Sequence, residues 1–343
     1  MFFHRMKSQD IRVNLATEDY LMKNYETEEP ILLMYIQNPC IIVGKHQNIY
    51  EEVALGNVEE DGVVLTRRLS GGGAVYDDLG NVSFSFVMKK GRTAFGDYVT
   101  ITEPIVKALK EMGVEDISIN GRNDLFIKDK KISGNAMYSK GEKMFSHGTL
   151  LYDVDLEKIK RYLTPSKEKL KTNHIQSVEA RVTNIKSHLS KKYQQMTTEE
   201  FRDELIMRIF GVSSLEAIKE KEIKLSDEDA INIQKRVADI YGNQEFVYGS
   251  HQEFSLKRRA YIKNVGLVIA ELEIEAGKIK DLSFSGDYFS QEDPNEMIEA
   301  LIGKRLIFNE LMKELELLAI GKYFTGLSRR DLVSLLLGEY SND

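Results

Sequence analysis

The chain has 343 residues, of which 42% are hydrophobic and 29% charged, values typical of a globular protein long enough for two domains. Its formal net charge of −7 argues against nucleic acid as a partner, because phosphate neutralisation needs excess lysine and arginine. We also expect no membrane partner, since no apolar run approaches about 18 residues, and the single cysteine, Cys40, predicts a cytoplasmic protein without disulfides.

The first half of the chain alternates between helical and strand patterns. Apolar residues at helical spacing predict a helix over 14–27, capped by Asn14 or Thr17. A second helix is predicted over 100–113, with Pro104 in its first turn and Gly113 at its end. Short apolar stretches that read as strands are 31–36, 40–46, 63–69 and 81–88.

The middle of the chain predicts a meander of strands over 117–154. Its turn signals are Asn120-Gly121, Lys128-Asp129-Lys130 and Lys140-Gly141. Helices are then predicted over 155–163 with Asp155 as the cap, from Pro165 onward, over 197–210 and over 226–241.

A polar, glycine-containing stretch at 242–256 marks a change of composition. We therefore predict one domain over residues 1–246 and a second over 247–343. The second begins with two or three strands over 260–289, with turns at Gly266 and Ala276-Gly277, and ends in helices. The predicted fold class is α+β, with a large domain of mixed sheets flanked by helices and a small α+β C-terminal domain.

Residues 67–78, RRLSGGGAVYDD, place three consecutive glycines between two predicted strands. The segment lacks the Gly-Lys-Ser/Thr of a Walker A loop and does not open a helix as a dinucleotide fingerprint does. It is either a plain glycine-rich connection or a place where ligand contacts bare backbone. Arg67 and Arg68 occupy opposite faces of a strand, so at most one of them should face such a ligand.

Lys131 stands apart from the lysines of the adjacent hairpin tip. Lys128 and Lys130 fit a solvated turn, whereas Lys131 begins the stretch KISGNA, whose small residues leave room beside it. An ammonium group there could meet negative charge that develops on a phosphate and an acyl oxygen.

His147 precedes a strand, where it could bind a ligand or satisfy a local backbone group. The six histidines show no zinc-binding spacing, and one cysteine cannot complete a thiolate site. Cys40 lies within an apolar run and reads as a small buried hydrophobe, and Ser70 lacks the sequence context of a nucleophile elbow.

These segments together resemble the lipoate–protein ligase family, which shares its catalytic fold with biotin–protein ligases. The resemblance runs through NLATEDYLM, IVGKHQNIYEEV, RRLSGGGAVYDDLGN, GRNDLFI, KISGNAM, HGTLLYDVDL and SVEARVTNI, and resumes weakly in LSFSGDYF. The first seven segments follow the family's order, which is far more specific than any one motif. The resemblance implies that lipoate and ATP give lipoyl-AMP, and that the lipoyl group then passes to a lysine of an acceptor protein.

The resemblance also implies roles for individual residues. Lys131 matches the catalytic lysine, which contacts the acyl carbonyl and the α-phosphate. Positions that match the lipoate pocket are Arg68, Ser70, Gly71, Gly72, Gly73 and His147. Positions that match the nucleotide site are Gly73, Val75, Tyr76, Asn81, Asn123, Asp124, Lys131 and Ala136. Asp124 is a suitable magnesium ligand because magnesium prefers carboxylate and phosphate oxygens.

One position departs from the family. Members commonly read GGGAVxHD, with histidine where this chain has Asp77. Either Asp77 points outward and the exchange is harmless, or the chain has a narrower choice of acceptor than its relatives. The expected acceptors are E2 lipoyl domains of 2-oxoacid dehydrogenases and glycine-cleavage H protein or an H-like protein. Alternative functions are an ATP-independent transferase acting between lipoyl or octanoyl carriers, which generally needs a cysteine nucleophile, and an inactive protein that binds lipoyl domains.

Overall fold

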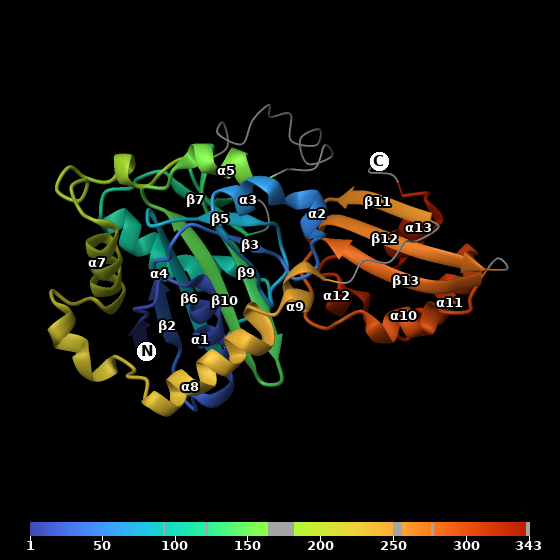
Figure 1. Ribbon diagram of the computed structural model, residues 1–343, viewed down its shortest axis with the longest axis horizontal. Coiled ribbons are helices and arrows are strands. Elements are labelled where there is room, and N and C mark those ends of the chain that lie inside the picture. Colours follow the sequence, from blue (N-terminus) through green and yellow to red (C-terminus); the bar gives the residue numbers. More distant parts are fainter. Residues whose placement is uncertain (92, 121–122, 164–181, 250–255, 276–277, 341–343) are drawn as a thin grey trace.

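The computed structural model describes residues 1–91, 93–120, 123–163, 182–249, 256–275 and 278–340 (Figure 1). Mixed β-sheets flanked by helices form most of the molecule, and a smaller group of strands and helices lies at one end. This arrangement confirms the predicted α+β class. The helix predicted from Pro165 and the turn residues Gly121 and Ala276-Gly277 lie outside the described residues.

The main sheet has seven strands in the order β1-β2-β6-β10-β9-β8-β7. Its strands are β1 (Phe2–Arg5), β2 (Ile31–Tyr35), β6 (Asn81–Lys89), β7 (Ile117–Asn120), β8 (Asp124–Ile127), β9 (Lys130–Lys140) and β10 (Lys143–Leu151). The strands from β7 to β10 pair antiparallel with one another in succession, which confirms the predicted meander. Strand β1, which was not predicted, pairs parallel with β2 at the sheet edge.

Helix α1 (Ile11–Asn24) begins three residues earlier than predicted. Its N-cap is Asp10, whose carboxylate accepts a hydrogen bond from the backbone N–H of Arg12 at 2.9 Å, so the predicted cap at Asn14 or Thr17 is wrong. The helix begins at Ile11 because this side chain is buried and belongs to its apolar face.

Helix α4 (Tyr98–Glu111) is capped by Asp97, which accepts from the backbone N–H of Thr100 at 3.1 Å. Because the helix starts before residue 100, Pro104 lies in its second turn, and the predicted first-turn position is wrong. Gly113 follows the C-cap with φ of 104°, as predicted for the helix end. Helices α4 and α7 (Thr198–Phe210) pack on one face of the main sheet.

A second, three-stranded sheet faces the other side of the main sheet. It has the order β4-β3-β5 and consists of β3 (Cys40–Val43), β4 (Val64–Arg67) and β5 (Val75–Asp77). The glycine segment therefore joins β4 to β5. Strand β5 was not predicted, because it has only three residues, which are too few for an alternating pattern to be recognised.

Several shorter helices cover these sheets. They are α2 (Ile49–Glu52), α3 (Leu55–Glu60), α5 (Leu156–Tyr162), α8 (Asp227–Arg236) and α9 (Gln244–Tyr248), with 3-10 turns at Lys186–His188 and Leu215–Lys221 and a π-turn at Val237–Tyr241. Helices α5, α7 and α8 confirm predicted helices, and Asp155 caps α5 as expected.

The C-terminal strands and helices pack around a core of their own. They are β11 (Leu256–Ile262), β12 (Gly266–Glu275), β13 (Lys278–Gly286), α10 (Asn295–Leu301), α11 (Phe308–Glu314), α12 (Ile320–Tyr323) and α13 (Arg329–Leu337). Figure 1 places this group at the far end of the molecule from α7. The boundary between residues 246 and 247 stays a prediction. Within the described part of the chain, no helix is long and apolar enough to cross a membrane.

Gly80 permits a close backbone contact that holds β6 in place, and we expect Gly80→Ala to be destabilising. A β-carbon there would lie 2.0 Å from the carbonyl oxygen of Asp153, so the backbone would have to shift. We expect the free energy of unfolding to fall by about 1–3 kcal/mol, measured by urea denaturation.

The matched control is Gly56→Ala in α3, where an added β-carbon meets nothing within 4 Å. That change should stabilise the protein by about 0.5–1 kcal/mol through helix propensity. Equal stability of the two variants would contradict the packing argument.

Candidate active site

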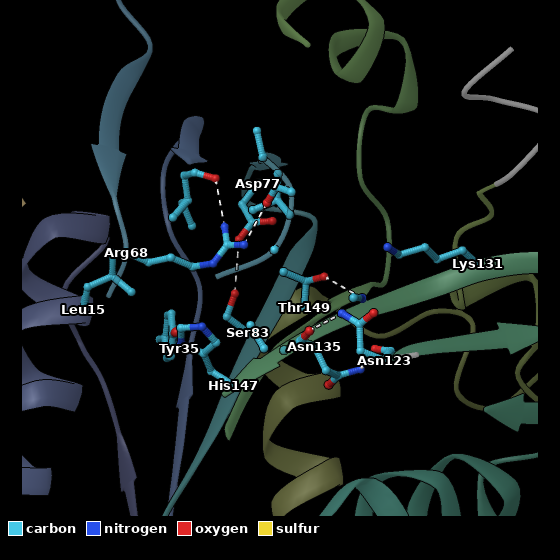
Figure 2. A pocket seen from close by; sticks show the side chains of 18 residues that line it. Leu15, Tyr35, Arg68, Asp77, Ser83, Asn123, Lys131, Asn135, His147 and Thr149 are labelled. Carbon is cyan, nitrogen blue, oxygen red and sulfur yellow. Dashed lines mark hydrogen bonds between the residues drawn. The ribbon is translucent and has the colours of Figure 1, made fainter. Parts of the chain in front are cut away.

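A cavity of about 110 Å³ lies between the two sheets (Figure 2). Leu15 of α1, Tyr35 of β2 and Ile42 of β3 form an apolar part. The remaining lining residues are Arg68, Gly72, Gly73, Ala74, Val75, Asp77, Ser83, Asn123, Lys131, Gly134, Asn135, Ala136, His147, Gly148 and Thr149. Figure 2 shows Arg68 and Lys131 on opposite sides of the cavity.

Arg68 organises the glycine segment from within. Its side chain is buried, and its guanidinium donates hydrogen bonds to the carbonyl oxygens of Gly71 at 2.7 Å and Gly73 at 2.8 Å. Burial lowers the pKa of this guanidinium to about 10, so it is still charged at neutral pH. Arg67 points away from the cavity and donates to the carbonyl groups of residues 44, 45, 47, 246 and 247. Only one of the two arginines therefore faces the cavity, as predicted.

A buried relay connects the glycine segment to helix α1. Arg68 Nε donates to Ser70 Oγ at 3.1 Å, and Ser70 Oγ lies 2.7 Å from His147 Nε2. His147 Nδ1 lies 3.0 Å from both carboxylate oxygens of Glu18. In the tautomer with its proton on Nδ1, His147 donates to Glu18 and accepts from the Ser70 hydroxyl, which in turn accepts from Arg68.

Lys131 forms an ion pair with Asp124 beside the cavity, with 2.9 Å between Nζ and Oδ1. Gly134 makes room for this pair, because a β-carbon on it would lie 2.9 Å from the ammonium nitrogen. The side chains of Lys131 and Asp124 are 34% and 27% exposed, so a ligand can reach them. Lys131 therefore presents a positioned cation at the open side of the cavity.

Two asparagines hold the start of β8 against β9. The amide of Asn123 donates to the backbone carbonyl of Asn135, and the amide of Asn135 donates to that of Asn123. The side-chain oxygen of Asn135 is buried and has no hydrogen-bond partner within the described chain. This exchange fixes the edge of the cavity from which Asp124 projects.

Asp77 is fully buried at the cavity wall. Its Oδ2 accepts hydrogen bonds from Gln37 Nε2 and, at 3.2 Å, from Ser83 Oγ. Its Oδ1 is buried and has no hydrogen-bond partner among the described residues. Burial raises the pKa of this carboxyl to about 7, although the hydrogen bonds from Ser83 and Gln37 oppose the shift. Asp77 therefore points inward, where a change of its protonation alters the cavity.

A C-terminal segment, residues 286–293, docks on the glycine segment. The backbone N–H of Gly72 donates to the Tyr288 carbonyl at 3.3 Å, and a β-carbon on Gly71 would lie 2.2 Å from the same oxygen. The Tyr288 ring stacks on His46, with centroids 4.4 Å apart, and burial lowers the pKa of that imidazole to about 3.

The structure brings together many of the residues expected from the sequence. Those that line the cavity are Arg68, Gly72, Gly73, Val75, Asn123, Lys131, Ala136 and His147. Ser70 and Asp124 contact lining residues without lining the cavity themselves. Gly71 meets the C-terminal segment, and Asn81 is buried and donates to Ser83. Tyr76 faces the opposite side of β5 and packs on Tyr162.

Some residues of the site were not recognised in the sequence. Glu18 is 1% exposed and aligns His147, yet in the sequence it looks like an ordinary polar residue of an amphipathic helix. Tyr35 and Ser83 belong to strands whose face toward the cavity could be found only after the sheets were paired. For Ser83, the alternation of polar and apolar residues in NVSFSF was the available signal that it lies on a different strand face from its neighbours.

The arrangement is suited to an elongated acid that becomes activated at one end. Leu15, Tyr35 and Ile42 provide an apolar wall, and glycine backbone lies along the cavity. Lys131 supplies a cation near its open side. No thiol nucleophile lines the cavity, and Cys40 is fully buried with its pKa raised well above the usual value by burial.

Residues 10–210 match the family described as "Lipoyl protein ligase A/B catalytic domain", and residues 251–336 match "Bacterial lipoate protein ligase C-terminus". The chain is 37% identical to the lipoate-protein ligase LplJ of Bacillus subtilis, over 98% of this chain and 99% of the relative. It is also 37% identical to lipoate–protein ligase 1 of Staphylococcus aureus, over 95% and 97% of the two chains.

Solved structures share the fold. LipL1 of P. falciparum in complex with lipoate superposes with a TM-score of 0.76 and 24% identity, covering 98% of this chain and 99% of that one. A bipartite lipoate protein ligase from Thermoplasma acidophilum, described with its E2 lipoyl domain, gives 0.61 and 24% identity, covering 74% and 98%. A lipoate-protein ligase A bound with ATP gives 0.59 and 23%, covering 73% and 99%.

The buried carboxyl of Asp77 should make stability depend on pH. The folded protein holds a proton up to about pH 7, whereas the unfolded chain releases it near pH 4, so the free energy of unfolding falls as pH rises between these values. Asp77→Asn removes this loss. We expect its stability relative to the parent protein to rise by on the order of 1 kcal/mol per pH unit from pH 5 to 7, in urea denaturation.

Asp116→Asn is the control, because Asp116 is exposed. A difference between Asp77→Asn and the parent that does not change with pH would show that Asp77 is ionised throughout.

Proposed function

The chain belongs to the lipoate–protein ligase family, and we propose that it attaches lipoate to a lysine of an acceptor protein in an ATP-dependent reaction. The observation that carries this proposal is that Lys131, the glycine segment and His147 all line the same cavity. Its apolar wall suits the carbon chain of lipoate, and its open side holds a lysine–aspartate pair suited to phosphates.

In the proposed first half-reaction, a carboxylate oxygen of lipoate attacks the α-phosphorus of ATP. The bond to pyrophosphate breaks, and lipoyl-AMP forms. Lys131 stabilises the charge that develops on the phosphate and acyl oxygens, and Asp124 orients its ammonium. Arg68 keeps the glycine carbonyls turned toward itself, so these carbonyls do not face the anion.

In the proposed second half-reaction, the amine of the acceptor lysine attacks the acyl carbon. The bond to AMP breaks, an amide forms, and the amine releases a proton. No residue of the chain needs to act as a covalent nucleophile. The chain instead positions the two reactants and keeps water from the mixed anhydride.

We propose that ATP acts with magnesium. Asp124 is the residue that would hold the ion together with phosphate oxygens, and it is a carboxylate partly open to solvent. The described residues contain no group of three metal-ligating side chains, so most of the ligands would come from nucleotide and water. Bound magnesium would neutralise phosphate charge during the transfer.

Acceptors of two kinds fit the proposal, namely E2 lipoyl domains and glycine-cleavage H protein or an H-like protein. The E2 lipoyl domain is named with the Thermoplasma acidophilum ligase, whose fold this chain shares. We also propose that the reaction takes place in the cytoplasm, which agrees with the free thiol of Cys40. The C-terminal residues, from 247 onward, are proposed as an accessory domain that reorients or closes during the cycle.

A mass measurement of the acceptor tests the proposed function. The purified protein is incubated with lipoate, magnesium-ATP and either H protein or an E2 lipoyl domain. We expect the acceptor to gain one lipoyl group only when ATP is present. Transfer from an acylated carrier without ATP would instead establish the transferase function. An unmodified acceptor together with no lipoyl-AMP would favour the inactive protein that binds lipoyl domains. Cys40→Ala should keep most activity, since this thiol is buried and does not line the cavity.

Lys131→Ala should reduce lipoyl-AMP formation by at least 100-fold, because the developing charge loses its cation. Lys130→Ala is the matched control, since Lys130 is exposed at the hairpin tip and does not line the cavity. Lipoyl-AMP is measured by mass spectrometry, with circular dichroism to verify folding. Adenylation retained in folded Lys131→Ala would remove this lysine from its assigned role.

A further inference from the structure

A second cleft lies outside the catalytic cavity, between helices α1 and α8 and the end of β1. Its volume is about 540 Å³, against about 110 Å³ for the candidate active site. This is within the roughly 300–1,000 Å³ typical of small-molecule sites. Neither the reaction proposed above nor any residue predicted for it uses this cleft, which we name the α1–α8 cleft.

The walls of the α1–α8 cleft are largely apolar. The residues that provide them are Met6, Val13, Ile223, Leu225 and Ile233. They come from the chain after β1, from α1, from residues 222–225 and from α8, so the fold itself assembles this surface. Such walls stabilise a hydrocarbon chain through removal of apolar surface from water.

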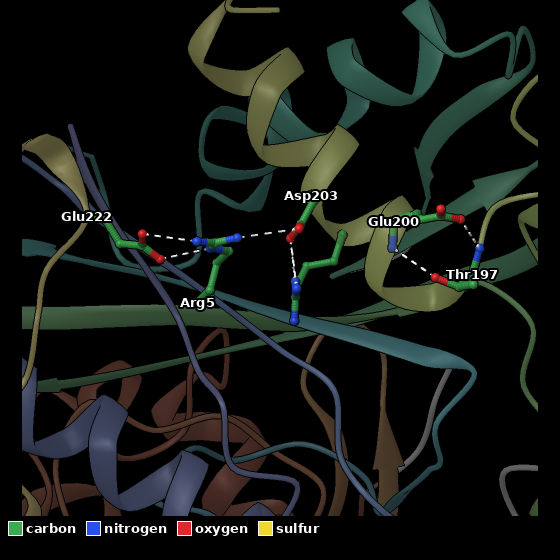
Figure 3. Close-up of polar contacts among 6 residues, drawn as sticks. Arg5, Thr197, Glu200, Asp203 and Glu222 are labelled. Atoms are coloured by element: carbon green, nitrogen blue, oxygen red, sulfur yellow. Dashed lines mark hydrogen bonds and ion pairs between the residues drawn. The ribbon is translucent and has the colours of Figure 1, made fainter. Parts of the chain in front are cut away.

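The charges around the cleft have a positive balance. Arg5 donates to Glu222 in two hydrogen bonds of 2.8 and 3.1 Å and lies 3.5 Å from Asp203 (Figure 3). Asp203 also pairs with Arg202 at 2.8 Å, so two arginines balance these two acids. Lys7 and Lys224 also line the cleft, and both are exposed. Neither forms an ion pair within the described part of the chain. In a protein of net charge −7, this local reversal of sign favours an anion.

One polar side chain of the cleft has no hydrogen-bond partner among the described residues. Asn14 is fully buried and lines the cleft, yet neither its amide nitrogen nor its oxygen has a hydrogen-bond partner among the described residues. A buried amide without partners is costly, so it marks a place for a ligand or water. His4 does not compete for the anion, since it bonds Ile223 and burial lowers its pKa.

We propose that the α1–α8 cleft binds a small carboxylic acid with an apolar chain. The Asn14 amide donates to the carboxylate, the ammonium groups of Lys7 and Lys224 fold over it, and the chain contacts the apolar walls. Long lysine stems can reach a buried head group while remaining in contact with solvent. Lipoate itself and medium-chain fatty acids share this chemistry.

Titration calorimetry with octanoate and with lipoate, in the absence of ATP, tests the proposal. We expect two binding sites on the parent protein for whichever acid is the ligand. The double variant Lys7→Glu/Lys224→Glu should lose one site, with at least tenfold weaker affinity, and keep the other. Octanamide, which lacks the charge, should bind the cleft at least tenfold more weakly than octanoate.

Lys107→Glu/Lys110→Glu on α4 is the matched control, because these exposed lysines line neither cavity and their reversal makes the same change in net charge. Photo-crosslinking with a diazirine-bearing octanoate should label residues 223–234 of the parent protein and not of the cleft double variant. A single site that the cleft double variant retains, unchanged binding in that variant, or labels confined to the catalytic cavity would overturn the proposal. A failure of ligase activity would leave these measurements unaffected.

Discussion

The candidate active site depends on one buried cation. The guanidinium of Arg68 binds the carbonyls of Gly71 and Gly73 and that of Ile42, the last at 3.2 Å, so it ties the glycine segment to the small sheet. Three consecutive glycines lose much conformational entropy when ordered, and these charge-assisted hydrogen bonds offset that loss. The desolvation of the guanidinium is compensated by the same carbonyls, and the loop and its cation are therefore stable only together.

Close backbone contacts extend this order outward. A β-carbon on Gly44 would lie 1.9 Å from the carbonyl oxygen of Gly72, so two loops touch without intervening side chains. Gly134 similarly leaves space for the ammonium of Lys131. The relay from Arg68 through Ser70 and His147 then reaches Glu18 of α1, so the glycine segment and the helix that carries Leu15 share one hydrogen-bonded framework.

The parts of the site that the sequence could predict are those carried by local motifs. The glycine segment, Lys131 and His147 were recognisable because their neighbours in the chain are unusual, and the structure places them around one cavity. Glu18 could not be recognised, since its role depends on β10 lying against α1. The environment of Asp77 was also beyond prediction, because Gln37 reaches it from the loop after β2, 40 residues away in the chain, and Ser83 reaches it from β6. Helix α4 began early because Asp97 is a better cap than the residues expected to start it.

The docked C-terminal segment occupies a backbone donor of the glycine segment. The Tyr288 carbonyl occupies the N–H of Gly72, and His46 and Ser290 add a hydrogen bond of 2.7 Å to the same contact. A ligand that needs this N–H binds only the fraction of molecules in which the segment has left it. Its apparent dissociation constant then equals the intrinsic constant divided by that fraction. Because this segment belongs to the same chain, dilution does not weaken its contact with Gly72. The stability of the contact therefore determines the concentration at which such a ligand occupies the site.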